Sequence, residues 1–132
     1  MAYAYNLKFT PPFPNLPVVL HPIEGGEATK TINALIDTGA DFTLVPLAHL
    51  KRLQAEMLYP TQVRSHWGEF TSGHVYVVDL EVAGELLPAI PVVADRRGKE
   101  IILGRNVLNK LILLLDGLHQ QTDVLTRRPR RL

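Results

Sequence analysis

Short apolar runs alternate with glycine, proline and polar turn residues along most of the chain, a pattern typical of a mostly β domain. Strand-like runs at residues 18–21 and 28–33 flank the turn signal Glu24-Gly25-Gly26-Glu27 and predict a hairpin whose second strand continues to Ile36. Further strands are expected over residues 42–45, 85–90, 92–94, 101–103, 111–115 and 124–125. The frequent turns indicate a closed or sandwich-like β domain.

Helical spacing is confined to two short stretches. Leu47, Leu50 and Leu53 follow Pro46, which suits the first turn of a helix. A second short helix is expected at about residues 105–109. Neither stretch approaches the roughly 20 apolar residues of a membrane span.

Residues 63–81 predict a long hairpin. Val75, Val77 and Leu80 mark its return strand, and residues 67–73 form a tip with two glycines and two aromatic side chains. An ordinary hairpin with Trp67 folded into the core and a hairpin with Trp67 facing a ligand both fit this pattern. The sequence leaves these two interpretations open.

The length of the chain and its proline-rich segment predict one domain with two terminal extensions. The 132 residues suit a single domain, and Thr10-Pro11-Pro12-Phe13-Pro14 predicts an extended segment because proline fixes φ. We therefore expect an extended arm over residues 1–15, a folded domain over 16–126 and a basic tail over 127–132. The last strand-like stretch, residues 124–125, is a candidate for pairing with a partner chain.

Charge is concentrated at the C-terminus. The net charge is +1, and without the four arginines of the last six residues it is −3 (+1 minus 4). We interpret this tail as a solvated terminus rather than a nucleic-acid contact. The chain starts without a basic region followed by an apolar core, so we expect a cytoplasmic protein with neither a membrane nor a nucleic acid as partner.

The run Ala34-Leu35-Ile36-Asp37-Thr38-Gly39-Ala40-Asp41 delivers a carboxylate from an apolar strand directly into a turn. Gly39 allows the backbone to bend and to approach a neighbour closely. A carboxylate held at a buried strand end is costly unless it is hydrogen-bonded or shares its charge. Asp37 is therefore either a structural turn residue or a group required by chemistry.

The acid turn resembles the active-site signature of aspartic proteases, and Asp41 narrows the resemblance to the retroviral type, the retropepsins. Ile101-Ile102-Leu103-Gly104-Arg105-Asn106 resembles the second hallmark of that family, and the likeness extends over roughly residues 16–118. It implies a retropepsin-like closed β-barrel or sandwich half-domain with one or two short helices, and a flap formed by the long hairpin. One acid turn per chain implies half an active site and hence a homodimer.

The resemblance implies an aspartic endopeptidase acting on a polypeptide substrate. Two copies of Asp37 would share a proton, one acting as base and the other as acid, to activate water for attack on a peptide carbonyl. No covalent intermediate, metal or cofactor is implied. The alternative is a catalytically silent retropepsin-like module that dimerises and binds polypeptides.

Neighbouring residues take roles from the same resemblance. Thr38 would hydrogen-bond across the dimer, the carbonyl of Gly39 would bind a substrate amide, and Asp41 would bind substrate and pair with Arg105. Phe42 stands where viral enzymes often carry a polar residue, which suggests a more apolar pocket. Simpler interpretations are a strand-end hydroxyl for Thr38 and a surface ion pair for Asp41 and Arg105. The expected substrate-binding residues are Ala40, Asp41, Phe42, Trp67 and Gly68, and the expected structural residues are Leu103, Gly104 and Arg105.

Overall fold

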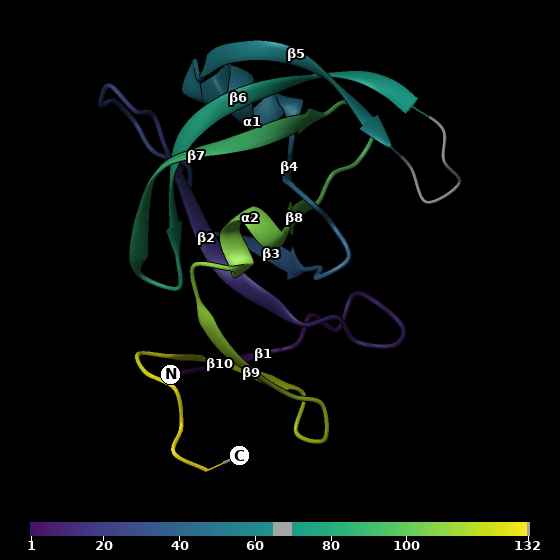
Figure 1. The fold of residues 1–132 in the computed structure, drawn as a ribbon, viewed down its shortest axis with the longest axis vertical. Coiled ribbons are helices and arrows are strands. Elements are labelled where there is room, and N and C mark those ends of the chain that lie inside the picture. Colours follow the sequence, from purple (N-terminus) through teal and green to yellow (C-terminus); the bar gives the residue numbers. More distant parts are fainter. Residues whose placement is uncertain (65–69, 132) are drawn as a thin grey trace.

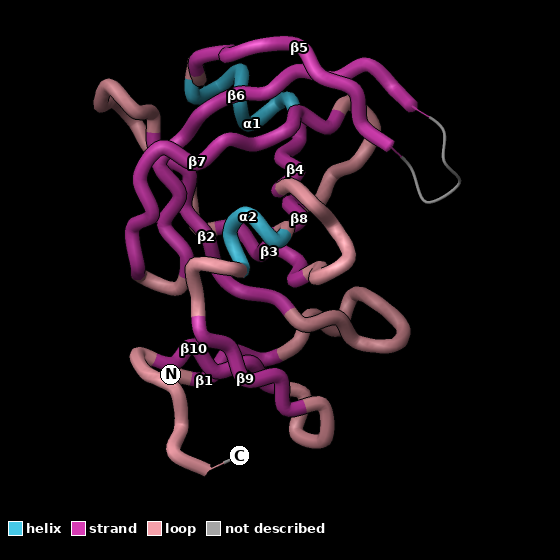
Figure 2. Tube along the Cα trace, in the orientation of Figure 1, coloured by secondary structure: helices cyan, strands magenta, loops and turns pink. Residues whose placement is uncertain are grey.

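The computed structural model describes residues 1–64 and 70–131, and this part of the chain forms two β-sheets with two short helices (Figures 1 and 2). The strands are β1 (Ala2–Ala4), β2 (Asn15–His21), β3 (Ile32–Ile36), β4 (Thr43–Pro46), β5 (Glu56–Arg64), β6 (Phe70–Val82), β7 (Glu85–Asp95), β8 (Ile101–Leu103), β9 (Ile112–Asp116) and β10 (Gln121–Leu125). The helices are α1 (Leu47–Leu53) and α2 (Arg105–Leu108).

The larger sheet closes into a barrel. Its strand order is β2-β3-β8-β4-β7-β6-β5, and an additional pairing of β2 with β6 joins the ends so that only β5 lies outside the ring. Along β2, Leu16, Val18 and Leu20 alternate toward the interior and are almost completely buried. This alternation has the period of two that places every second side chain on one face of a strand. The expected mostly β, closed architecture is confirmed.

The smaller sheet carries both ends of the chain, below the barrel in Figure 1. Its order is β1-β10-β9, so β10 is the central strand and pairs with both neighbours. Val124 and Leu125 are paired on one side, with Leu113 and Ile112 of β9, whereas β1 pairs only with residues 121–123 of β10. Pairing of residues 124–125 with a partner chain therefore stays a prediction. Asn15 Nδ2 donates a hydrogen bond to the carbonyl of Ala4 at 3.0 Å, which ties this sheet to the barrel.

The long hairpin consists of β5 and β6 and is more extensive than the sequence suggested. Its antiparallel pairing runs from Glu56 opposite Val77 to Arg64 opposite Phe70. Residues 70–73, expected in the tip, therefore belong to the return strand. Trp67 and Gly68 lie outside the described residues.

Strand β7 corrects a second boundary, because the two strands expected over 85–90 and 92–94 form one. Ala89 has a positive φ of 52°, and the register with β6 shifts between Val78 and Leu80. This irregularity lets the strand continue through Pro91, which lies opposite Val77.

Both predicted helices are present. Leu50 and Leu53 of α1 are buried, and Pro46 precedes its first residue. Within residues 1–64 and 70–131, neither helix has the length and apolar character needed to cross a bilayer.

Candidate active site

Strands β3 and β8 bring the two sequence motifs side by side. They pair in parallel, with Ala34 opposite Ile101 and Ile36 opposite Leu103. The acid turn after Ile36 and the turn at Gly104 after Leu103 therefore leave the sheet at the same end. This placement depends on strand pairing between segments that lie far apart in the sequence.

The main chain fixes Asp37 in the turn that follows β3. Its N–H donates to the carbonyl of Leu103 at 3.1 Å, and its own carbonyl accepts the N–H of Ala40 at 3.2 Å. Its carboxylate oxygen Oδ1 accepts the N–H of Gly39 at 2.9 Å. The side chain is half-buried. Asp37 is thus a pre-oriented carboxylate, the property that a catalytic acid or base requires.

Space is tight at both turn glycines, neither of which has a left-handed backbone, and at Gly104 the close atoms belong to the main chain. A Cβ on Gly39 would lie 3.2 Å from Asp37 Oδ1. A Cβ on Gly104 would overlap the backbone carbonyl group of Phe42 and lie 3.0 Å from the carbonyl oxygen of Ala40. The turn at Gly104 therefore packs directly against the segment that carries the acid, and a side chain there would push the two turns apart.

A buried hydrogen-bond network below these turns involves two residues whose role the sequence analysis missed, Thr43 and Asn106. The Thr43 hydroxyl donates to Asn106 Oδ1 at 2.9 Å and accepts the N–H of Gly104 at 3.1 Å. Asn106 Oδ1 also accepts the N–H of Thr43 at 3.0 Å, and its Nδ2 donates to the carbonyl of Pro91 at 2.9 Å. Thr43 has no exposed surface. The network joins β4, β7 and the Gly104 turn.

Arg105 connects the second motif to the acid turn. Its guanidinium pairs with the Asp41 carboxylate and donates from Nη1 to the carbonyl of Thr38 at 2.9 Å. Its backbone N–H donates to the carbonyl of Ala40 at 2.9 Å. The expected pairing of Asp41 with Arg105 is therefore present. Both side chains are exposed, so the pair alone contributes little stability, but Arg105 spans the turn at three points.

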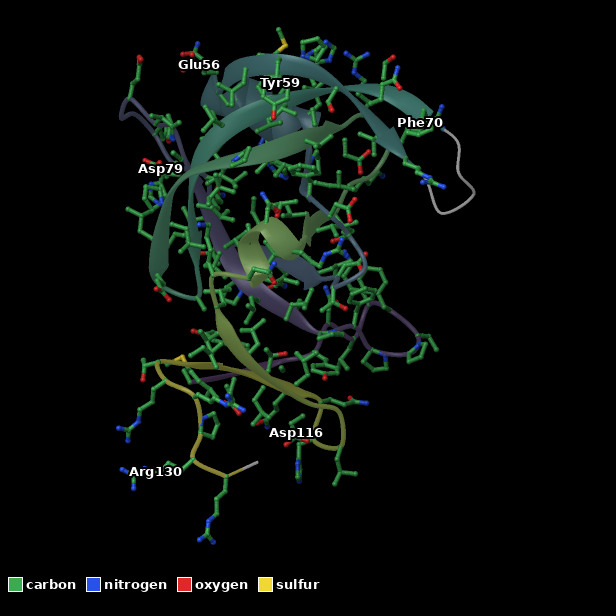
Figure 3. All side chains as sticks on the ribbon, in the orientation of Figure 1. Glu56, Tyr59, Phe70, Asp79, Asp116 and Arg130 are labelled. Atoms are coloured by element: carbon green, nitrogen blue, oxygen red, sulfur yellow. The ribbon has the colours of Figure 1, made fainter. Side chains whose placement is uncertain are left out.

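Two aromatic residues near the expected substrate side are exposed to solvent. Phe42, which follows the acid turn, is 47% exposed, and Phe70, at the start of β6, is 64% exposed (Figure 3). The guanidinium carbon of Arg64 lies 5.9 Å from the centre of the Phe70 ring. Thr38 is also exposed, which leaves its side chain accessible to a second molecule.

Comparisons with known proteins agree with this geometry. Residues 24–110 match the sequence model of a family described as gag-polyprotein putative aspartyl protease, a range that contains both turns. No curated protein sequence matches the chain closely enough to count as a relative.

Solved structures of low sequence identity share the fold. A retropepsin-like aspartic protease from Rickettsia conorii has a TM-score of 0.66 at 13% identity, covering 94% of this chain and 88% of its own. The EIAV protease, solved with the inhibitor HBY-793, has a TM-score of 0.57 at 23% identity, covering 82% and 93%. The retroviral protease-like domain of Ddi1 from Leishmania major has a TM-score of 0.56 at 15% identity, covering 87% and 90%.

The family match extends over most of the chain and includes the acid turn, the Gly104 turn and the strands that hold them together. The chain therefore belongs to the gag-polyprotein aspartyl protease family, whose members are retroviral-type, retropepsin-like aspartic proteases.

Proposed function

We propose that this chain is an aspartic endopeptidase whose active form is a homodimer with one Asp37 from each subunit. The observation that carries the proposal is the asymmetry of the two paired turns. One holds the carboxylate of Asp37 against the N–H of Gly39, whereas the equivalent place in the other is occupied by Gly104. A single chain therefore supplies one acid at this place, and a second copy is the simplest source of another.

Two carboxylates facing each other at short range do not both ionise easily, so the pair retains one proton at mildly acidic pH. The ionised member takes a proton from a water molecule as that water attacks the peptide carbonyl. The protonated member donates to the carbonyl oxygen, and a proton then passes to the leaving nitrogen. The two groups titrate as a unit. In this scheme the main-chain hydrogen bonds of Asp37 hold the carboxylate in place.

The surface of the small sheet supports self-association. Its edge strand β9 presents the apolar residues Ile112, Leu114 and Leu115, which are 38%, 43% and 45% exposed. Strands β1 and β9 form its two edges, whose outer hydrogen-bonding groups face away from β10. Exposed apolar edge strands are favourable places for pairing with another chain.

The hairpin β5–β6 supports a role as a flap over the substrate. It extends from the barrel on the same side as the connection between β3 and β4 (Figure 1). The exposed ring of Phe70 gives this end of the hairpin an apolar contact surface (Figure 3). We infer that the flap and Phe42 together bind substrate side chains.

Cleavage of a peptide library at several acidic pH values tests the proposal. We expect activity with an optimum below neutrality, inhibition by a statine-type transition-state analogue and no effect of chelators. Activity per chain is expected to fall on dilution as the dimer dissociates. Asp37→Asn keeps the size and one hydrogen-bond acceptor of the side chain, so it is the matched inactive control.

The alternative function is a silent module that dimerises and binds extended polypeptides. It predicts peptide binding without cleavage, and equal binding by the wild type and Asp37→Asn. The same library distinguishes the two functions, because cleavage that is lost in Asp37→Asn excludes the silent module. An undiminished cleavage rate in a pure preparation of Asp37→Asn would exclude Asp37 as the catalyst.

A further inference from the structure

A groove of about 680 Å³ lies outside the acid turn, between α1, β6 and the connection from β7 to β8. Figure 1 shows α1 at the same end of the barrel as β5, β6 and β7. The residues that define its chemistry are Leu47, Lys51, Tyr76, Asp95, Arg96 and Lys99. Since Asp37 and its neighbours do not line it, the groove is distinct from the candidate active site.

Cations dominate the groove. Lys51, Arg96 and Lys99 are all exposed, and within residues 1–64 and 70–131 none of them has a carboxylate partner within 4.0 Å. Arg96 Nη2 lies 3.5 Å from Nδ1 of His74. The groove therefore offers three positive charges to a ligand.

Asp95, the one carboxylate among the described residues that line the groove, is hydrogen-bonded to the backbone of its own turn. Asp95 Oδ1 accepts the N–H groups of Arg97 and Gly98 at 3.0 and 2.9 Å. These hydrogen bonds hold the connection between β7 and β8 in a tight turn that carries Arg96 and Lys99. Asp95 thus shapes the cationic rim of the groove.

The positive groove contrasts with the rest of the folded chain. The sequence without its four C-terminal arginines has a net charge of −3 (+1 minus 4). Clustering of three cations on a body of the opposite net charge creates a local field that attracts anions. The walls also include the aliphatic side chain of Leu47 and the ring of Tyr76. Apolar walls beside cations suit a polypeptide better than a bare phosphate.

We propose that this groove binds an acidic segment of a polypeptide, through ion pairs with Lys51, Arg96 and Lys99 and apolar contacts with Leu47 and Tyr76. The proposal deepens the proposed function, since such a segment would tether a substrate outside the catalytic cleft. Only the statement that the acidic segment belongs to a substrate rests on the proposed function, because binding of the segment does not require catalysis.

Fluorescence polarisation with a labelled, Asp- and Glu-rich peptide tests the groove directly. The protein is used as Asp37→Asn, so that cleavage does not interfere. We expect saturable binding that weakens as NaCl rises from about 0.05 M to about 0.3 M, because exposed ion pairs are screened. A peptide of the same length with Lys in place of Asp and Glu should not bind.

Charge reversal identifies the site. The triple variant Lys51→Glu, Arg96→Glu, Lys99→Glu should bind the acidic peptide at least about tenfold more weakly, since each exposed ion pair contributes a few-fold. The matched control is Lys30→Glu, Lys110→Glu, Arg128→Glu, which changes net charge equally with exposed residues outside the groove. Replacing the three groove cations with Gln should weaken binding in the same direction without new repulsion.

Equal weakening in both charge-reversed variants would overturn the proposal, because it would reflect net charge alone. Tighter binding of a single-stranded oligonucleotide of equal charge would also overturn it and assign the groove to nucleic acid. The groove proposal and the catalytic proposal can fail independently. If the wild-type protein binds the acidic peptide but cleaves no peptide, the catalytic proposal is wrong and the groove proposal stands. The same three groove substitutions in a chain that keeps Asp37 should cleave neutral peptides at the wild-type rate, which would show that the active site is unaffected.

Discussion

Replacing Gly104 with alanine tests the close packing of the two turns. The added Cβ would overlap the backbone carbonyl group of Phe42 and lie 3.0 Å from the carbonyl oxygen of Ala40. Overpacking a rigid site costs about 1–3 kcal/mol. Separation of the turns would also weaken the hydrogen bond from the Gly104 N–H to the Thr43 hydroxyl, worth about 0.5–1.5 kcal/mol. We therefore expect Gly104→Ala to lower the free energy of unfolding by about 2–4 kcal/mol.

Urea unfolding followed by circular dichroism measures this loss as a lower midpoint with little change in slope. Gly117→Ala is the matched control, because a Cβ on Gly117 meets nothing within 4 Å and its φ is not in the left-handed region. The control should differ from the wild type by well under about 1 kcal/mol. The reasoning is refuted if Gly104→Ala and Gly117→Ala unfold at the same urea concentration.

Three further changes address individual interactions. Thr43→Val keeps the side-chain shape but leaves the buried N–H of Gly104 without its acceptor and removes one of the two hydrogen bonds to Asn106 Oδ1. Urea unfolding should therefore show a loss of about 1–3 kcal/mol, and an unchanged midpoint would contradict the network. Asp41→Asn removes the charge that pairs with Arg105. Because both side chains are exposed, the free energy of unfolding should change by less than about 1 kcal/mol, while peptide cleavage falls. A large loss of stability with normal cleavage would show that Asp41 stabilises the fold and does not bind substrate. Burial lowers the pKa of His49, so as pH falls through about 6.5 the unfolded chain binds more protons than the folded chain and the wild type loses stability. His49→Gln should therefore lose less stability than the wild type between about pH 7 and pH 5. Identical profiles of unfolding free energy against pH for the two proteins would show that His49 does not contribute.

Local patterns were sufficient to predict the acid turn, the preceding strand and the first helix. Ile36 ends β3 directly before Asp37, and Leu47–Leu53 forms α1 with Leu50 buried. These features depend on the period of apolar residues and on turn chemistry, which are encoded within a few neighbouring positions. The second motif, at Gly104, was identified from family resemblance and not from local pattern, and its pairing with the acid turn is seen only in the structure.

Features that depend on distant partners were predicted poorly. Thr43 and Asn106 are separated by 63 positions, and no local pattern shows that β4 and α2 place them together. The central position of β10 depends on pairing with β1 at the opposite end of the chain. Pro91 suggested a break in β7, but the strand continues because its register with β6 shifts at an irregularity near Ala89.

Subunit mixing measures most directly whether two Asp37 carboxylates from different chains form one catalyst. Wild-type protein is mixed with an equal amount of Asp37→Asn, allowed to exchange subunits, and assayed where both are dimeric by sedimentation. If both carboxylates are required, only wild-type pairs cleave peptides, and activity is roughly a quarter of that of wild-type protein at the same total concentration. Activity of roughly half would mean that each wild-type chain works independently, and would contradict the account.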